Sequence, residues 1–423
     1  MQHAIRTGAI AALVVLAAPG GVLASEVVPG ASLPALLELA KANNPEYASM
    51  RYEAQAATER VVPAGALPDP KFRTEWMDVT KAGSQNPTLL PANVGSTKYT
   101  LMQDLPWFGK LDLKKNIAQQ EAQAAQGKVL GTWAELAAKI KVTYAQRNFF
   151  HQTQKLTREL LDLTTRLANV AQVRYGGGLA MQQDAIRAQV EQTAMQTELV
   201  SLAGEARQAD ARLNALLARP INAPLAEPES PRPLPGPAQL DADALMARVR
   251  QGNPQIFTEE ARIQSAGLSR DLTLKNRYPD FTLAISPTQV QSGISEWGVM
   301  LELNIPLQQG ARRAQEREAQ AMLDAARSRR EAVANQVLSD LSENLAALDS
   351  AQRTEQLTKS SLLPQAELTF QAALAGYENG KLDFATLLDA QRQVRLAKQS
   401  QLKAQLEAQM RLAEIEKLVG ETL

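Results

Sequence analysis

Residues 105–110 read Leu-Pro-Trp-Phe-Gly-Lys, and residues 305–310 read Ile-Pro-Leu-Gln-Gln-Gly. In both places a strand-like run ends at a proline, and a long stretch with few helix breakers begins after a glycine. Proline ends a strand because it has no N–H to donate to the neighbouring strand. The sequence therefore predicts two strand-to-helix junctions, each marked by a proline and a glycine: Pro106 and Gly109, then Pro306 and Gly310.

Two very long helices are expected after these junctions. Residues 110–174 contain no proline, and residues 311–376 contain the single proline Pro364. Each run of about 65 residues would form a helix close to 100 Å long, at about 1.5 Å per residue. No compact domain holds a helix of that length.

Each long helix is followed by a tight turn and a return helix. The return helices are expected at about 181–218 and about 383–419, and they carry apolar residues at coiled-coil spacing. The turns read Tyr-Gly-Gly-Gly at 175–178 and Tyr-Glu-Asn-Gly at 377–380. Their turn residues are Gly176, Gly177, Gly178, Asn379 and Gly380.

The chain thus repeats a unit of about 200 residues. A short amphipathic helix runs into Asn44-Pro45 in the first copy and into Asn253-Pro254 in the second. About 20 helical residues follow each pair. If this helix of about 20 residues stacks end to end with the return helix, the two together are about as long as the outgoing helix. We assign the two repeats and the Pro- and Ala-rich linker between them to residues 25–218, 240–423 and 219–239, respectively.

Four runs alternate between apolar and polar side chains, as strands do when one face is wet and the other is apolar. They cover about 71–80, 97–105, 280–286 and 296–305. An ordinary half-buried surface hairpin is the alternative interpretation. The residues expected on the apolar side include Phe72, Trp76, Tyr99, Leu101, Phe281, Leu283, Ile285, Trp297, Val299, Leu301, Leu303 and Ile305.

The composition excludes several kinds of site. The chain has 45 basic and 45 acidic side chains and no cysteine. Balanced charge argues against a nucleic-acid partner, and the lack of cysteine excludes disulfides, thiolate metal sites and thiol nucleophiles. His151 is the one histidine beyond the N-terminal segment, so the preferred transition-metal ligands are missing. No catalytic constellation emerges, and we expect neither enzymatic activity nor a cofactor.

Residues 1–24 have the features of a secretory signal peptide. Arg6 gives a weakly positive start, residues 8–18 are continuously apolar, and residues 22–24 supply the small side chains that a signal peptidase needs. The apolar run is too short to span a bilayer stably. We therefore expect secretion and cleavage after Ala24.

These elements predict a mainly α chain with a small β part that requires copies of itself. Four strands cannot close a barrel, and an open sheet edge cannot lie in lipid. Three copies would supply twelve strands, enough to surround a water-filled lumen, and a matching set of helical columns. The expected fold is a trimeric 12-stranded outer-membrane β-barrel continued by a long periplasmic α-helical barrel, with two tandem repeats per chain.

The tandem plan and the two tip segments, 175–189 and 377–391, resemble those of TolC-type outer-membrane efflux factors. The resemblance covers essentially the whole mature chain. Residues 102–111, Met-Gln-Asp-Leu-Pro-Trp-Phe-Gly-Lys-Leu, and residues 67–70, Leu-Pro-Asp-Pro, resemble the heavy-metal and cation-efflux (CzcC-like) branch. The resemblance implies a homotrimer in outer-membrane lipid, with its helical part in the periplasm. It also implies docking onto a periplasmic adaptor (membrane fusion protein) and an inner-membrane efflux pump, and export of substrates, expected to be metal cations.

The resemblance further implies a periplasmic gate of polar side chains just past the tip glycines. Three-fold repetition of one aspartate would favour cations in a narrow pore. Thr386 stands in the second repeat where the first has Asp184, so a second complete acidic ring is in doubt. The alternative is that the tip residues are solvated and cap helices, as Asp383 could. The expected gate residues are Asp389, Asp184, Tyr377, Tyr175, Arg187 and Arg392.

Two other functions stay open on the sequence alone. A periplasmic coiled-coil adaptor or scaffold without a pore would also contain long hairpins, although it would typically have one hairpin and additional small β-domains. A TolC-type duct for drugs or secreted proteins would share the whole plan, because substrate selection is expected to reside in the pump. Detergent-dependent trimers in outer-membrane fractions would favour a duct over a scaffold.

Overall fold

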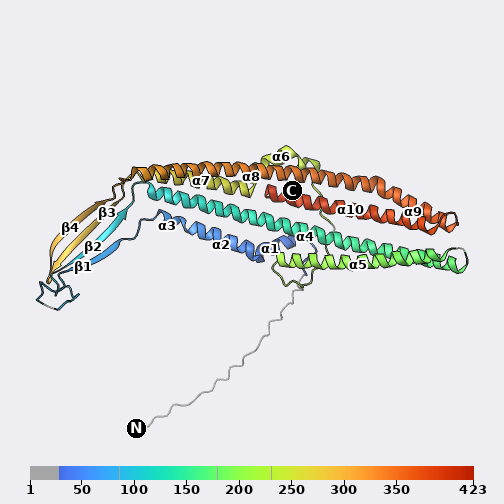
Figure 1. The fold of residues 1–423 in the computed structure, drawn as a ribbon, viewed down its shortest axis with the longest axis horizontal. Coiled ribbons are helices and arrows are strands. Elements are labelled where there is room, and N and C mark those ends of the chain that lie inside the picture. Colours follow the sequence, from blue (N-terminus) through green and yellow to red (C-terminus); the bar gives the residue numbers. More distant parts are fainter. Residues whose placement is uncertain (1–27, 85, 179, 230) are drawn as a thin grey trace, which may run out of the picture.

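The computed structural model describes residues 28–84, 86–178, 180–229 and 231–423, so the expected signal peptide lies outside the described residues. The molecule is elongated, with a sheet at one end and two helical hairpin tips at the other (Figure 1). None of the described helices has an 18-residue window apolar enough to cross a membrane.

The two repeats have the same order of elements. The first contains α1 (Leu33–Asn43), α2 (Pro45–Glu59), α3 (Val61–Gly65), β1 (Lys71–Met77), β2 (Ser96–Leu105), α4 (Lys110–Gly176) and α5 (Gln182–Leu216). The second begins after a short 3-10 helix, η1 (Pro237–Leu240). It contains α6 (Ala242–Gly252), α7 (Pro254–Lys275), β3 (Phe281–Val290), β4 (Gly293–Leu303), α8 (Gln309–Leu357), the π-helical turn η2 (Thr358–Leu362), α9 (Leu363–Glu378) and α10 (Phe384–Val419).

The repeated asparagines join helices end to end. Asn253 caps α7 by accepting hydrogen bonds from the backbone N–H groups of Gln255 and Ile256, at 2.9 and 3.1 Å. Its amide also donates to the carbonyl of Leu418, near the end of α10, at 2.8 Å. Asn44 caps α2 and donates to the carbonyl of Leu216, at the end of α5, in the same way. One side chain per repeat therefore satisfies a helix start and a helix end, which aligns α2 with α5 and α7 with α10.

The four strands form one antiparallel sheet in the order β1-β2-β3-β4. The register pairs Phe281, Leu283 and Ile285 with Leu303, Leu301 and Val299, and pairs Leu101 with both Phe72 and Ile285. This confirms that the alternating apolar residues of all four strands share one face. We call this the apolar face and define it by its large, exposed members: Phe72, Trp76, Leu101, Leu283, Ile285, Trp297, Val299, Leu301 and Leu303.

Three strands differ in extent from the prediction. β4 spans Gly293–Leu303 rather than about 296–305, so Ile305 lies beyond its end. β1 ends at Met77 rather than near residue 80, because Asp78 adopts a left-handed backbone (φ 53°) that starts the loop to β2. β3 continues beyond residue 286 to Val290, through Pro287. The ladder tolerates this proline because β2 forms no residue pair with positions 286 and 287.

The second outgoing helix is interrupted, whereas the first is continuous. We expected one helix over about 311–376, but η2 separates α8 from α9 directly before Pro364. Proline has no N–H for the i−4 carbonyl, and its ring clashes with that carbonyl, so a wider turn forms. In the first repeat, without a proline, α4 extends over 67 residues.

The linker expected at 219–239 packs against the middle of the helices. Arg232 forms two hydrogen bonds to the Glu416 carboxylate, at 2.9 and 2.7 Å, and the Lys141 ammonium binds the same carboxylate at 2.9 Å. Glu416 and Lys141 are both buried. These contacts tie the linker to α4 and α10 and so connect the two repeats at mid-height.

Candidate functional site at the hairpin tips

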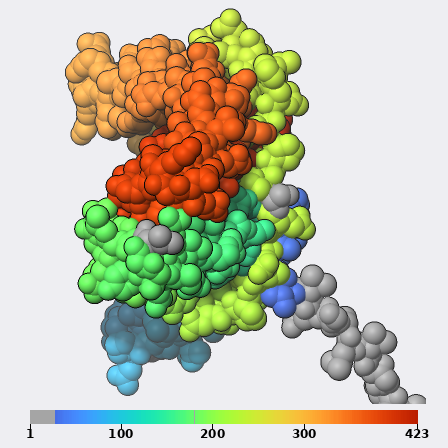
Figure 2. Space-filling view, turned by 90° about the vertical axis from the view of Figure 1, so that its right-hand side faces the viewer, coloured from blue at the N-terminus to red at the C-terminus, as the bar shows by residue number. Residues whose placement is uncertain are grey.

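Both hairpins reverse at glycines with left-handed backbones. Gly178 (φ 71°) follows the end of α4, and Gly380 (φ 70°) follows the end of α9. A side chain is strained at such angles, which accounts for glycine at these two positions. The tips lie against each other at the end of the molecule opposite the sheet, the first green and the second orange to red (Figure 2).

The two tip tyrosines occupy different environments. Tyr377 is buried and packs on Phe384 with 5.3 Å between ring centroids, whereas Tyr175 is 46% exposed. Burial raises the pKa of the Tyr377 hydroxyl, and the nearby Asp184 carboxylate adds to the rise. The two residues match in sequence, but only Tyr377 lies between the hairpins.

Arg174, which the sequence analysis did not single out, joins the end of α4 to the end of α9. Its guanidinium lies over the Tyr377 ring, 4.9 Å from the centroid. One nitrogen, Nη1, donates to the carbonyls of Tyr377 and Glu378, each at 3.0 Å. These carbonyls belong to the last turn of α9, where a cation is favoured by the helix dipole.

Asp184 and Asp389, the predicted acidic gate residues, differ in exposure. Asp184 lies in the first turn of α5 and is buried, whereas the side chain of Asp389, on α10, is 69% exposed. Arg187 is exposed, and its charge helps to lower the pKa of Asp383, after the larger effect of the hydrogen bonds from Thr386. Asp383 is thus the N-cap of α10, and its carboxylate accepts hydrogen bonds from the N–H and the hydroxyl of Thr386.

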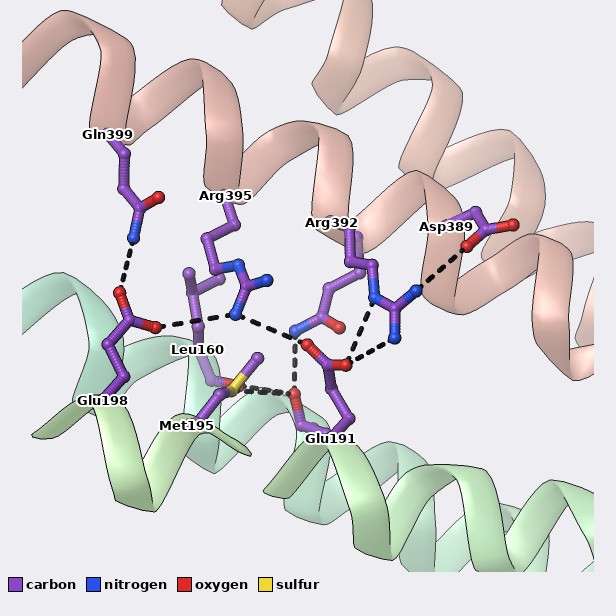
Figure 3. Close-up of polar contacts among 10 residues, drawn as sticks. Leu160, Glu191, Met195, Glu198, Asp389, Arg392, Arg395 and Gln399 are labelled. Atoms are coloured by element: carbon purple, nitrogen blue, oxygen red, sulfur yellow. Dashed lines mark hydrogen bonds and ion pairs between the residues drawn. The ribbon is translucent and has the colours of Figure 1, made fainter. Parts of the chain in front are cut away.

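Further up the hairpins, Arg392 connects α10 to α5 (Figure 3). Its Nη2 and Nε donate to the same oxygen of Glu191, at 2.7 and 3.2 Å. Its Nη1 lies 3.6 Å from the Asp389 carboxylate. Glu191 is buried, and removing this guanidinium would take away its hydrogen-bond donor on α10.

A second set of contacts continues this layer away from the tips. Arg395 lies 3.4 Å from the other Glu191 oxygen and 3.6 Å from Glu198, and Gln399 donates to Glu198 at 2.8 Å. We call Glu191, Glu198, Arg392, Arg395 and Gln399 the inter-hairpin latch. The sequence contains a pattern that indicates the latch but that the sequence analysis missed. Glu191 and Glu198 are seven residues apart, as are Arg392 and Gln399, and this spacing places each pair on one helix face.

Buried polar atoms around the latch are incompletely satisfied. Among the described residues, Nε of Arg174, Oη of Tyr377, Oε1 of Glu191, Oε1 of Gln391 and Nε of Arg395 have no hydrogen-bond partner. A buried polar layer with unpaired atoms is held less firmly than a fully satisfied one.

The predicted strand-to-helix junctions are not equivalent in detail. Pro106 and Pro306 follow β2 and β4 closely, and Gly109 has a left-handed backbone (φ 77°) before α4. Gly310, by contrast, lies within the first turn of α8. No group of three or more His, Cys, Asp or Glu side chains that could hold a metal ion occurs in the described ranges.

The outer membrane efflux protein family matches residues 36–219 and 245–421, one match for each repeat. CzcC of Cupriavidus metallidurans, named a cobalt-zinc-cadmium resistance protein, is 24% identical over 370 residues, which are 85% of this chain and 83% of that protein.

Solved structures share the fold. VceC, an outer membrane protein of Vibrio cholerae, is similar with a TM-score of 0.78 and 17% identity, over 92% of this chain and 96% of that chain. CusC is similar with a TM-score of 0.78 and 17% identity, over 92% of both chains.

The chain is accordingly an outer-membrane efflux channel with its helical part in the periplasm. Its family consists of efflux channels, which are not enzymes. Because the family match covers both repeats and most of the chain, this protein belongs to the outer membrane efflux protein family.

Proposed function

We propose that three copies of this chain form one exit duct. In this proposal the duct releases metal cations that an inner-membrane pump delivers through a periplasmic adaptor. The observation that carries the proposal is the exposed apolar face of an incomplete sheet.

The sheet ends in two edge strands, β1 and β4. On β4 the apolar side chains are largely exposed: Trp297 by 65%, Val299 by 82% and Leu301 by 60%. Such a surface is stable in hydrocarbon, but the unpaired N–H and C=O groups of the two edges are not. Pairing β4 of one copy with β1 of the next removes both edges, and three copies would give a closed barrel of twelve strands.

The other face of the sheet suits a water-filled interior. Lys71 and Asp104 form an ion pair there, at 2.6 Å, and Thr282 donates to the same aspartate at 2.7 Å. Glu302 lies on this face opposite Thr282. Charged residues on one face and apolar residues on the other are the pattern of a barrel that conducts solutes.

The latch supports a gate at the opposite end. Within one copy it holds the α4–α5 hairpin against the α9–α10 hairpin, so three copies would bring three latches around the periplasmic mouth. Exchange of partners by Arg392, which contacts both Glu191 and Asp389, would allow the tips to separate when an adaptor docks. In this proposal the hairpin tips open because ion pairs change partners, and no helix has to unfold.

Two observations support metal cations as the cargo. The matched relative is named for cobalt, zinc and cadmium resistance. The exposed Asp389 would also place three carboxylates near the threefold axis, which would favour cations over anions.

The cargo is tested in a strain that lacks this gene but keeps the cognate pump and adaptor. We expect lower tolerance to zinc, cobalt and cadmium and higher cellular metal content, both reversed by the wild-type gene. A panel of hydrophobic drugs is tested in parallel. Restored drug tolerance with unchanged metal tolerance would assign the duct to drug export instead.

A further inference from the structure

We propose that the border between the sheet and the helices binds the headgroups of anionic phospholipids in the adjacent membrane leaflet. This inference rests on the proposed insertion of the sheet in lipid. The proposed site combines an aromatic cluster, which continues the apolar face, with a surplus of basic side chains beside it. We call it the junction band and define it by Trp107, Phe108, Lys110, Lys114, Lys275, Arg277, Tyr278, Arg312 and Arg313.

The aromatic cluster begins where the apolar face ends. Trp107 stacks on Tyr278, with 5.1 Å between ring centroids and 9° between planes, and meets the edge of Phe281 at 5.9 Å. Phe281 is paired with Leu303 of the apolar face. Phe108 is 75% exposed and Tyr278 is 51% exposed, so part of the cluster is open to its surroundings. Aromatic rings of this kind settle where hydrocarbon meets water.

Lys275 places a cation directly at this cluster. Its ammonium donates to the carbonyl of Phe108 at 3.1 Å. A Cβ at Gly109 would lie 2.5 Å from that nitrogen, so the glycine leaves room for the lysine. Lys275 takes part in no ion pair within the part of the chain that the structure describes, and its charge is available to a phosphate.

Basic residues outnumber the acid on the side of α7 and α8. The Glu316 carboxylate accepts two hydrogen bonds from Arg277, each at 2.5 Å. These bonds chiefly hold the pKa of Glu316 below its usual value, and the charges of Arg313 and Arg312 lower it further. Glu316 is thus paired with Arg277, while Arg312 donates to the carbonyl of Asn276. Arg312 and Arg313 take part in no ion pair among the described residues, which leaves a local excess of positive charge.

At the start of α4, three lysines, Lys110, Lys114 and Lys115, lie near two acids, Asp112 and Asp280. Asp280 accepts a hydrogen bond from the Lys110 ammonium at 2.8 Å and one from the Trp107 N–H at 2.7 Å. Burial opposes ionisation of Asp280, but these two hydrogen bonds and the charges of Lys110 and Lys114 hold its pKa below its usual value. The starts of α4 and α8 and the end of α7 lie at one level beside the sheet (Figure 1). The excess charge therefore forms a band at one height.

The phosphate of an anionic phospholipid has the charge and the hydrogen-bond acceptors that the junction band can bind. Each phosphodiester carries one negative charge and oxygen atoms that accept hydrogen bonds from lysine and arginine. Basic clusters next to a membrane surface attract anionic headgroups, and a zwitterionic headgroup gains much less. The aromatic cluster would fix the depth at which the acyl chains end.

The test is a lipid titration of the detergent-purified protein, followed by native mass spectrometry. Phosphatidylglycerol and phosphatidylcholine with the same acyl chains are compared for the wild type, for Lys275→Gln/Arg313→Gln, and for the control Arg207→Gln/Lys403→Gln. The control removes two exposed charges on α5 and α10, away from the sheet. We expect the wild type and the control to prefer phosphatidylglycerol. We also expect the first variant to lose roughly tenfold or more of that affinity, with phosphatidylcholine binding unchanged.

The spectra separate this inference from the proposed function. Trimers that bind the two lipids equally, or a Lys275→Gln/Arg313→Gln variant that keeps its preference, would overturn the lipid site and leave the duct intact. Masses of a single chain would instead remove the proposed duct. Each variant is judged by the ratio of its affinities for the two lipids, so a general loss of stability does not imitate the expected result.

Discussion

At the hairpin tips, single side chains connect helices that are far apart in the sequence. Arg392 and Glu191 lie 201 positions apart and bind through a charge-assisted hydrogen bond of 2.7 Å. Arg174 reaches from α4 to the last carbonyls of α9. If the tips open, these bonds break in the same transition, so their strength sets the balance between closed and open tips.

Replacing Arg392 should shift that balance toward the open state. We expect Arg392→Ala to destabilise the closed tips by about 2 kcal/mol, roughly a 30-fold change in the equilibrium, because buried Glu191 loses its hydrogen bonds to Arg392. Single-channel recordings in planar bilayers should show higher mean conductance. Arg207→Ala, an exposed control on α5, should behave as wild type. Equal conductance of Arg392→Ala and wild type would show that the latch does not gate.

Glu416 links stability to pH at the middle of the molecule. Burial alone would raise the pKa of Glu416, but the hydrogen bonds from Arg232 and the charge of Lys141 lower it below its usual value. A carboxyl whose pKa is lower when folded contributes stability fully above its unfolded pKa, about 4.3. That contribution is lost as the pH falls through the folded value.

We therefore expect Glu416→Gln to lower the free energy of unfolding at neutral pH by about 3 kcal/mol, because Lys141 stays buried without its partner. Below about pH 4, the free energy of unfolding of the variant should fall less steeply with decreasing pH than that of the wild type. Thermal unfolding between neutral and acid pH measures both effects, and Glu407→Gln, at a partly exposed ion pair, serves as the control. Parallel pH curves for Glu416→Gln and wild type would exclude this role for Glu416.

The sequence located the tip but could not assign partners within it. The offsets from the tip glycines placed Asp184 and Asp389 on the return helices, yet nothing local shows that the first is buried and the second exposed. Tyr175 and Tyr377 have the same sequence context, and only the packing between hairpins separates them. Glu191 was missed because its partner lies on another helix, and such a pairing depends on tertiary structure.

At the scale of elements, the repeated Asn-Pro pair has two tasks. As a sequence motif it predicted a helix start, and the structure shows that the same asparagine also binds the end of the return helix. The interruption at η2 was not predicted, although Pro364 was noted, because neighbouring turns can absorb a proline in several ways. β3 was predicted too short because the alternation was followed only to residue 286, whereas the strand continues through Pro287 to Val290.

The double task of the asparagine makes Asn253→Ala more harmful than the loss of a cap alone. We expect the free energy of unfolding to fall by about 1–2 kcal/mol, since the cap of α7 is lost and the Leu418 carbonyl loses its donor. Chemical unfolding followed by circular dichroism measures the change. Asn335→Ala, on an exposed face of α8, should change stability by less than about 0.5 kcal/mol. Equal effects of the two variants would contradict the joining role.

At the scale of the whole molecule, the proposed duct places the apolar face in lipid. We expect Val299→Glu/Leu301→Glu to reduce the amount of protein in outer-membrane fractions strongly, because each buried charge in hydrocarbon costs about 2–3 kcal/mol. Met300→Glu, on the opposite face of the same strand, should insert nearly as well as wild type. Immunoblots of separated membranes provide the measurement. Normal insertion of the double variant would mean that this face does not contact lipid.

The sequence predicted the overall plan well because its signals are long-range and redundant: a tandem repeat, two helices of unusual length and four alternating strands. Assembly is different, since no residue pattern alone shows which copies meet. The claim that neighbouring copies complete the sheet is tested most directly by the native mass of the detergent-extracted channel. Our account predicts a species of three chains that dissociates only on denaturation. A stable, folded single chain in detergent would contradict it.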